Sequence, residues 1–443
     1  MDALIQRVRQ VLPDVRRDLE ELVRIPSVWS DESRRDDVYR SARKVAELLD
    51  EAGFASVEIV SEGGAPAVIA HHPAPPGAPT VLLYAHHDVQ PEGDAAQWDS
   101  PPFEPVERDG RLYGRGTADD KAGIATHLAA FRAHDGRPPV GVTVFVEGEE
   151  ECGSPSLSRL LAAHQHKLAA DVIVIADSDN WTADIPALTV SLRGLADCVV
   201  EVATLDHGLH SGLWGGVVPD ALTVLIRLLA TLHDDDGNVA VAGLHEAHAA
   251  PVDRDAGWVR AESGMLEGVR EIGSGTVAQR LWAKPAITVV GIDTTPIDKA
   301  SNTLIPRARA KVSLRVAPGA DSAAHLAVLR RHLEQHAPWG AHVTVTPGDV
   351  GQPYAIDATG PVYDAARAAF REAWGAEAID MGMGGSIPFI AEFAAAFPDA
   401  TILVTGVEDP GTQAHSVNES LHLGVLERAA ITEALLLGKL GSG

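Results

Sequence analysis

The chain is poor in cysteine, in basic residues and in long apolar runs. Its 443 residues include only two cysteines, Cys152 and Cys198, which excludes a disulfide framework and a thiolate zinc site. The 36 Lys and Arg are outnumbered by 62 Asp and Glu, for a formal net charge of −26. This acidity argues against nucleic acid or an anionic membrane as a partner, because both attract basic surfaces. No apolar run approaches membrane-spanning length and the first residues lack a signal-peptide core, so we expect a cytoplasmic protein.

Strand-like and helix-like segments alternate in the first part of the chain. Apolar runs at 80–85, 140–146 and 172–176 predict buried strands, and segments 123–132 and 157–166 predict helices between them. Strands that alternate with helices are typical of an α/β layer with a largely parallel sheet.

The pattern changes after about residue 187. Strand-like segments with polar alternation, such as 197–203 and 308–316, indicate an antiparallel sheet with helices on one face. The α/β pattern returns near the C-terminus. We therefore predict an α+β domain, residues 188–352, inserted into an α/β domain formed by residues 1–187 and 353–443.

Three consecutive glutamates, Glu149, Glu150 and Glu151, follow the predicted strand 140–146. Like charges at the end of a buried strand repel one another unless a cation compensates them or one carboxyl is protonated. The triplet therefore indicates a metal site or acid–base chemistry, and a solvated acidic loop is the simpler alternative.

Four predicted strands end in residues suited to metal binding, and in open α/β sheets ligands bind beyond the carboxyl ends of the strands. A fifth segment, Gly114 to Gly123, opens a helix and places Asp119 at its start. Oxygen and imidazole ligands without cysteine suit zinc, manganese or cobalt, and they suit a two-metal site. The residues at the strand ends are His86-His87-Asp88, Glu150-Glu151, Asp177 and His415.

These motifs resemble the M20 family of metallopeptidases, in particular its carnosinase-like branch of cytosolic non-specific dipeptidases. The resemblance runs in family order across nearly the whole chain. The matching segments are HHDVQP at 86–91, GRGTADDK at 114–121, EGEEECGS at 147–154, IAD at 175–177, LHSG at 209–212, SLR at 313–315, GGSIP at 384–388 and AHSVNE at 414–419.

The resemblance implies two divalent ions per subunit, zinc in the first place with manganese or cobalt as alternatives. His86, Asp119 and Asp177 would hold one ion. Asp119 would bridge to the second ion, which Glu151 and His415 would complete.

The resemblance also implies the catalytic roles in the first domain. Glu150 would be the general base that activates the shared water and then protonates the leaving amine. Asp88 would orient His86, and Glu149 would only add supporting charge. The Asp119–Asp120 peptide is expected to be cis.

By the same resemblance, the α/β domain is a catalytic domain of the di-metal aminopeptidase type, with a phosphorylase/hydrolase-like fold. The inserted domain would be a lid through which the chain forms a homodimer. His210 would reach the partner subunit's site and stabilise the oxyanion. Arg315 would bind the substrate's terminal carboxylate, and Thr303, Gly385 and Ser386 would contact the substrate.

The chain departs from the family pattern at two places. Gly382 and Met383 stand where the family commonly has an arginine and an acid, which predicts a less polar pocket. His87 stands where tyrosine is frequent. Five other histidines are expected on loops or helix surfaces, namely His71, His72, His127, His164 and His166.

The resemblance favours cleavage of dipeptides by an exopeptidase. Hydrolysis of N-acyl, N-succinyl or N-carbamoyl amino acids is the alternative, since it uses the same attack of water on an amide carbonyl. A non-catalytic, dimeric metal-binding relative is a remote third hypothesis.

Overall fold

The computed structural model describes residues 2–248, 252–385 and 388–442. The chain divides into two compact units. The first comprises Met1–Val190, Ile356–Met381 and Pro388–Gly443, and the second comprises Ser191–Ala355 and Gly382–Ile387.

The first unit is built on a six-stranded sheet with the order β1-β2-β6-β3-β7-β17. Four neighbouring strands are parallel, and two antiparallel strands extend the sheet at one edge. This is the largely parallel sheet predicted from the sequence. The strands are β1 (Ser56–Val60), β2 (Ala67–His72), β3 (Thr80–His86), β6 (Gly141–Glu147), β7 (Val172–Ala176) and β17 (Thr401–Thr405).

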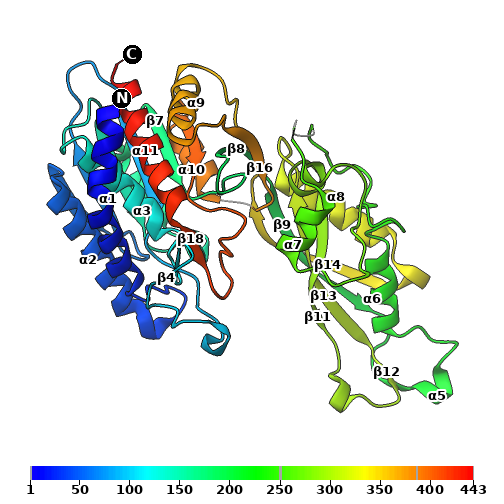
Figure 1. Cartoon of the computed structure of the whole chain (residues 1–443). Coiled ribbons are helices and arrows are strands. Elements are labelled where there is room, and N and C mark those ends of the chain that lie inside the picture. Colours follow the sequence, from blue (N-terminus) through cyan, green and yellow to red (C-terminus); the bar gives the residue numbers. More distant parts are fainter. Residues whose placement is uncertain (1, 249–251, 386–387, 443) are drawn as a thin grey trace. The chain divides into compact units, whose positions relative to one another are not determined.

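Helices cover both faces of this sheet because its central strands are apolar on both sides. On β3, Leu83 belongs to the core shared with the helix α3, whereas Tyr84 points to the opposite face and stacks on Phe389 of α10 at 4.4 Å between ring centroids. On the first face, α3 contacts β3 and packs against both α1 and α11 (Figure 1). The helices of this unit are α1 (Asp2–Val23), α2 (Arg35–Ala52), α3 (Lys121–Ala133), α4 (Leu157–Leu168), α9 (Pro361–Trp374), α10 (Pro388–Ala396) and α11 (Leu423–Leu440).

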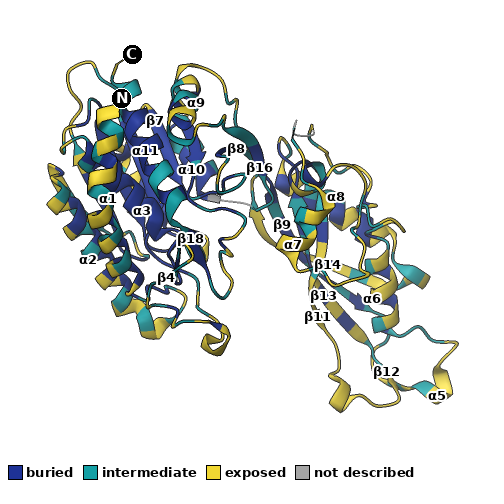
Figure 2. Cartoon of the chain, in the orientation of Figure 1, coloured by how far each residue is buried: buried dark blue, intermediate teal, exposed yellow. Residues whose placement is uncertain are grey.

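Burial differs sharply among these helices. Helix α3 is buried almost throughout, whereas α1 and α2 expose one face to solvent (Figure 2). The buried residues of α1, which include Val15, Leu19 and Leu22, recur at helical spacing. Helix α3 therefore lies between the sheet and an outer layer of helices, and its N-terminus is held inside the protein.

The second unit contains a four-stranded antiparallel sheet with the order β11-β13-β9-β14. Alternate residues of β13, such as Val312 and Leu314, are buried and form a core with helices α6 and α8. The predicted α+β pattern is confirmed. The elements are β9 (Gly194–Ala203), β11 (Ala286–Asp293), β13 (Arg307–Val316), β14 (His342–Gly351), α6 (Ala221–Ala230) and α8 (Ser322–Gln335).

Shorter elements complete the two units. Two small sheets have the orders β15-β8-β16 and β18-β5-β4, and β10 pairs with β12. None of the helices formed by the described residues is both long enough and apolar enough to cross a lipid bilayer. The short elements are β4 (Val106–Arg108), β5 (Arg111–Tyr113), β8 (Ala187–Leu192), β10 (Leu209–His210), β12 (Thr303–Leu304), β15 (Tyr354–Ala355), β16 (Ile379–Met383), β18 (Ser420–His422), α5 (Ser211–Trp214) and α7 (Ala256–Ser263).

Candidate metal centre

The predicted ligands of the first unit follow the carboxyl ends of neighbouring parallel strands. His86 is the last residue of β3, Asp177 follows β7, and Glu151 lies in the turn after β6. Because β6, β3 and β7 are adjacent and parallel, their ends meet at one edge of the sheet. Asp119 precedes α3, and His415 lies in the loop that follows β17.

Asp119 lies at the centre of the cluster and presents one carboxylate oxygen to each of two histidines. His86 Nε2 is 3.1 Å from Oδ1, and His415 Nε2 is 2.9 Å from Oδ2. His415 Nε2 is also 3.2 Å from Glu151 Oε2. A carboxylate whose two oxygens face different imidazoles has the arrangement required to bridge two ions.

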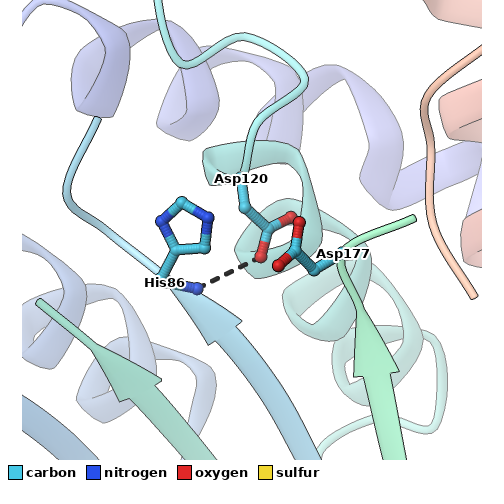
Figure 3. Close-up of side chains that lie close together, drawn as sticks. All are labelled: His86, Asp120 and Asp177. Atoms are coloured by element: carbon cyan, nitrogen blue, oxygen red, sulfur yellow. Dashed lines mark hydrogen bonds between the residues drawn. The ribbon is translucent and has the colours of Figure 1, made fainter. Parts of the chain in front are cut away.

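Asp120 joins the cluster, which sequence reasoning did not anticipate. Ligand atoms of His86, Asp120 and Asp177 lie within 4.8 Å of one another, as do those of a second group formed by Asp119, Glu151 and His415. Figure 3 shows the first group and the bond of 3.1 Å from the His86 main-chain N–H to Asp120 Oδ2. The other oxygen, Oδ1, is buried and has no hydrogen-bond partner among the residues that the structure describes. The Asp119–Asp120 peptide is cis, as expected.

Burial disfavours charge on most carboxyls of this cluster. It raises the pKa of Asp177 to about 7 and holds the pKa values of Asp120 and Glu150 well above the ordinary range. Asp119 is the exception. Burial opposes its ionisation, but hydrogen bonds from His415 and His86 outweigh burial and lower its pKa.

The pKa values of the histidines in the cluster are also raised, which for an imidazole favours the charged form. Hydrogen bonds to Asp119 and Glu151 raise the pKa of His415 to about 10. For His86, burial disfavours the imidazolium, yet hydrogen bonds to Asp119 and Asp88 raise the pKa well above its ordinary value.

Several carboxylates are buried together here, and within the described part of the chain Asp120 Oδ1 meets no donor. Oxygen and imidazole donors at this spacing fit divalent cations. The residues present therefore fit a pair of such ions.

Glu150 lies beside the cluster without being part of either candidate ligand group. Its Oε2 is 3.9 Å from His86 Nε2, and its side chain retains 16% exposure. The carboxylate oxygens of Asp88 each accept a main-chain N–H at 3.1 Å, one from Glu150 and one from Glu151. His86 Nδ1 lies 3.0 Å from the Asp88 carbonyl oxygen and 3.4 Å from its Oδ1. Asp88 thus contacts both His86 and the turn that carries the two glutamates.

Glu419 holds the loop that carries Asp119, and sequence reasoning had assigned it no role. One oxygen accepts the Gly116 N–H at 3.1 Å and pairs with Arg115 at 2.6 Å. The other accepts the N–H groups of Ala118 at 3.1 Å and Asp119 at 3.3 Å. The only sequence signal for this role is that Glu419 belongs to the same motif as His415.

Two other histidines of the first unit are buried and have structural partners. The expectation that His127 lies on a surface is wrong, because it is 1% exposed and its Nδ1 is 2.9 Å from a carboxylate oxygen of Glu433. Helix α3 lies under the layer formed by α1 and α11, and the helical pattern alone did not reveal this. His87 Nε2 is 2.8 Å from the Pro66 carbonyl oxygen, and burial lowers the His87 pKa to about 4, so the ring is neutral.

The remaining predicted site residues belong to the second unit. His210 and Thr303 are exposed and face each other across the β10–β12 pair. Arg315 lies on β13, where burial lowers its pKa. Gly385 follows β16, and Ser386 lies outside the described residues. Contact of these residues with a substrate stays a prediction.

The departure at Gly382 has a steric explanation. A Cβ at Gly382 would lie 2.6 Å from Trp282 Cβ and 2.8 Å from Ser191 Oγ. Trp282 therefore occupies the space that a side chain at position 382 would need. This contact between distant residues explains why an arginine cannot stand at this position of the chain.

Comparison with known proteins gives the class of the molecule. The fold and the cluster are those of a metallopeptidase. The description "Peptidase family M20/M25/M40" matches residues 82–439, and the chain belongs to this family.

Relatives cover nearly the whole chain. A cysteinylglycine-S-conjugate dipeptidase of Corynebacterium striatum is 37% identical over 431 residues, covering 95% of this chain and 94% of the relative. The human Beta-Ala-His dipeptidase is 29% identical over 458 residues, covering 95% and 89%. The crystal structure of human carnosine dipeptidase 1 has a TM-score of 0.79 at 24% identity and covers both chains completely. The predicted family and branch are confirmed.

Proposed function

We propose that this protein is a two-metal dipeptidase that hydrolyses the amide bond of small peptides. The observation that carries the proposal is the position of Asp119, with one oxygen toward His86 and the other toward His415, beside Glu150, which joins neither candidate ligand group. Relatives that share almost the full length of the chain and are named as dipeptidases support the substrate class.

The two ions would be held by side chains drawn from the two groups, with Asp119 of the second group shared by both ions. His86, Asp119 and Asp177 would hold one ion, with Asp120 close by, and Asp119, Glu151 and His415 would hold the other. When bound, such ions polarise the scissile carbonyl and lower the pKa of water. Zinc is the ion we propose first, with manganese and cobalt as alternatives, because all three accept these donors.

Glu150 is the proposed general base. It accepts a proton from the attacking water and delivers that proton to the nitrogen of the leaving amine. Burial, and then the nearby charges of Asp177 and Glu151, raise its pKa and make it a stronger base than an exposed glutamate. Asp88 fixes the main chain of Glu150 through its N–H.

The second unit would supply substrate contacts in a homodimer. We propose that Arg315 binds the terminal carboxylate and that Thr303, Gly385 and Ser386 contact the substrate. His210 would stabilise the oxyanion in the partner subunit's site. Apolar side chains exposed shortly after His210 in the chain, namely Leu213 at 77% and Val217 at 83%, support a surface that is covered in an assembly.

The two cysteines support a proposal for the cellular compartment. Cys152 and Cys198 are both free thiols. Unpaired cysteines are typical of a reducing compartment, and we propose the cytoplasm.

A substrate panel tests the reaction class. The zinc-loaded protein is offered free dipeptides, including Cys-Gly and β-Ala-His, and N-acetyl, N-succinyl and N-carbamoyl amino acids at equal concentration. We expect kcat/KM for the best dipeptide to exceed that for every N-acyl compound by about 100-fold or more. A preference for N-acyl compounds would establish the amidohydrolase alternative instead.

A further inference from the structure

The segment that follows β6 lies directly against the loop that joins β1 to β2. A Cβ at Gly148 would lie 2.4 Å from the Pro66 carbonyl oxygen. A Cβ at Gly64 would lie 2.5 Å from Glu149 Oε1. The two segments therefore approach through glycine main chain, and neither position has room for a side chain.

Glu149 connects the two segments and is buried, with 1% exposure. Its Oε2 accepts the Ala65 N–H at 3.0 Å, and its Oε1 accepts the Ser156 N–H at 2.7 Å and the Ser156 hydroxyl. These donors are neutral, and no hydrogen bond or ion pair from a Lys, Arg or His side chain to Glu149 is found in the described part of the chain. The expectation that Glu149 only adds supporting charge is therefore wrong, because its carboxylate is fully engaged inside the protein.

The same loop has a second point of attachment one residue further on. His87 Nε2 is 2.8 Å from the Pro66 carbonyl oxygen, next to the Ala65 N–H that Glu149 binds. His87 directly follows His86, and Glu149 directly precedes Glu150. The loop is therefore tied to the chain neighbours of a candidate ligand and of the candidate base.

The main chain around Glu150 is held from two sides. The Glu149 carbonyl accepts the N–H groups of Cys152 at 3.2 Å and Ser154 at 3.1 Å, which closes the turn that carries Glu150. Asp88 accepts the Glu150 N–H at 3.1 Å from the other side. Burying a carboxylate is unfavourable unless hydrogen bonds satisfy its oxygens. Here the bonds fix the residue next to the base.

We propose that Glu149 is a positioning residue for Glu150, and that Glu149 and His87 together tie the Glu150 turn to the loop of residues 61–66. Glu149 does not contact the substrate. It holds the main chain so that the Glu150 carboxylate reaches the water in the correct orientation. The proposal rests on the proposed role of Glu150 as general base.

Substitution of Glu149 tests the proposal by separating kcat from KM. Glu149→Ala removes the acceptor of three donors, and we expect kcat for a dipeptide to fall about tenfold or more. KM and the content of two ions per chain should stay at the wild-type values. Glu149→Gln keeps one acceptor oxygen at nearly the same place, so kcat should recover in part. A residue that only stabilises the fold would lower the melting temperature without this graded loss of kcat.

Gly64→Ala tests the contact between the loop and Glu149 by changing a residue of the loop. Gly64 does not have a left-handed φ, so the new methyl group acts through its clash with Glu149 and Ser156. We expect kcat to fall, and the loss in the double variant Gly64→Ala/Glu149→Ala should be smaller than the product of the single losses. Glu62→Gln is the matched control, because this carboxylate is on the same loop but faces His164 at 3.4 Å. Its kcat should equal that of the wild type.

The outcomes separate the two proposals. If Glu149→Ala folds with both ions and keeps kcat within about twofold of wild type, the positioning role is overturned. The positioning role is also overturned if added metal alone restores the activity of Glu149→Ala. If Glu149→Ala does not fold, Glu149→Gln and Gly64→Ala decide by the same criteria. A wild-type protein inactive on every dipeptide would overturn the proposed function as well.

Discussion

Buried carboxylates of the first unit and exposed ion pairs of the second unit are held in different ways. In the first unit, Glu419 and Asp88 are completely buried, and their oxygens accept main-chain N–H groups. In the second unit, pairs such as Arg309–Asp293 lie in solvent, with side-chain exposures of 58% and 67%. Buried carboxylates with several fixed donors hold a loop in one place, whereas exposed pairs are screened and weak. The proposed ligands and base thus lie beside buried, fixed carboxylates in the first unit, and the proposed contact residues His210 and Thr303 are exposed in the second.

The largest expected effect is the loss of the base from the first unit. Glu150→Ala should lower kcat by about 10²- to 10⁴-fold, because it removes the proton acceptor. Bound metal should stay at the wild-type level, because Glu150 is in neither ligand group. Steady-state kinetics with metal analysis by mass spectrometry is the measurement. Hydrolysis near the wild-type rate would rule out Glu150 as the base.

The second prediction tests whether the second unit contributes to catalysis. His210→Ala should lower kcat by about 10²- to 10³-fold if its imidazole stabilises the oxyanion. Mixing and re-equilibrating this variant with Glu150→Ala should restore about a quarter of wild-type activity, because half of the dimers would carry one intact site. No recovery in an exchanging dimer would place His210 outside the partner's site.

The third prediction concerns stability and sets a buried carboxylate against an exposed one. Glu419→Ala should lower the free energy of unfolding by about 3–5 kcal/mol, because it leaves Arg115 buried without its partner. Glu334→Ala breaks an exposed pair with Arg330 on α8 and should leave stability unchanged. Denaturant unfolding of both variants gives the comparison. Equal losses would show that the buried and the exposed carboxylate do not differ in their contribution to stability.

The fourth prediction concerns packing within the second unit. Gly382→Ala should cost about 1–3 kcal/mol, since its methyl group would press on Trp282. Gly291→Ala is the matched control, because a Cβ there meets nothing within 4 Å. Thermal unfolding distinguishes the two, and an unchanged melting temperature for Gly382→Ala would argue against the steric explanation.

The smallest expected effect is a change with pH in the stability that His127 gives to the first unit. Burial disfavours the charged form of His127, but Glu433 of α11 raises its pKa, and its other ring nitrogen lies 3.0 Å from the Tyr84 carbonyl. A raised histidine pKa adds stability below the unfolded value of about 6.5, and that stability is lost as pH rises through the folded pKa. Relative to His127→Gln, wild-type stability should therefore decline from pH 6 upward. Parallel curves for the two proteins would contradict the pairing.

Much of the fold and the site could be predicted because the signals are local in sequence. Apolar runs such as 172–176 predicted the central strands, and the candidate ligands were predicted at the ends of these runs or in the loops that follow them. Asp120 was missed because its neighbour Asp119 accounted for the motif, and only its position near Asp177 brings it into the cluster. His127 was missed because burial of α3 depends on the helices above it.

The sequence by itself determined the family, the order of its motifs and the candidate ligand side chains, since each is carried by short segments with a fixed pattern. Only the tertiary structure decided which buried carboxylates hold those ligands in place. Glu419 binds the Gly116 N–H across 303 residues, and Glu149 binds the Ala65 N–H across 84. Such contacts depend on which loops the sheet brings together, and no local pattern encodes them. The glutamates that look alike in sequence thus have different contacts, and these contacts support the proposed roles of ligand, base and positioning residue.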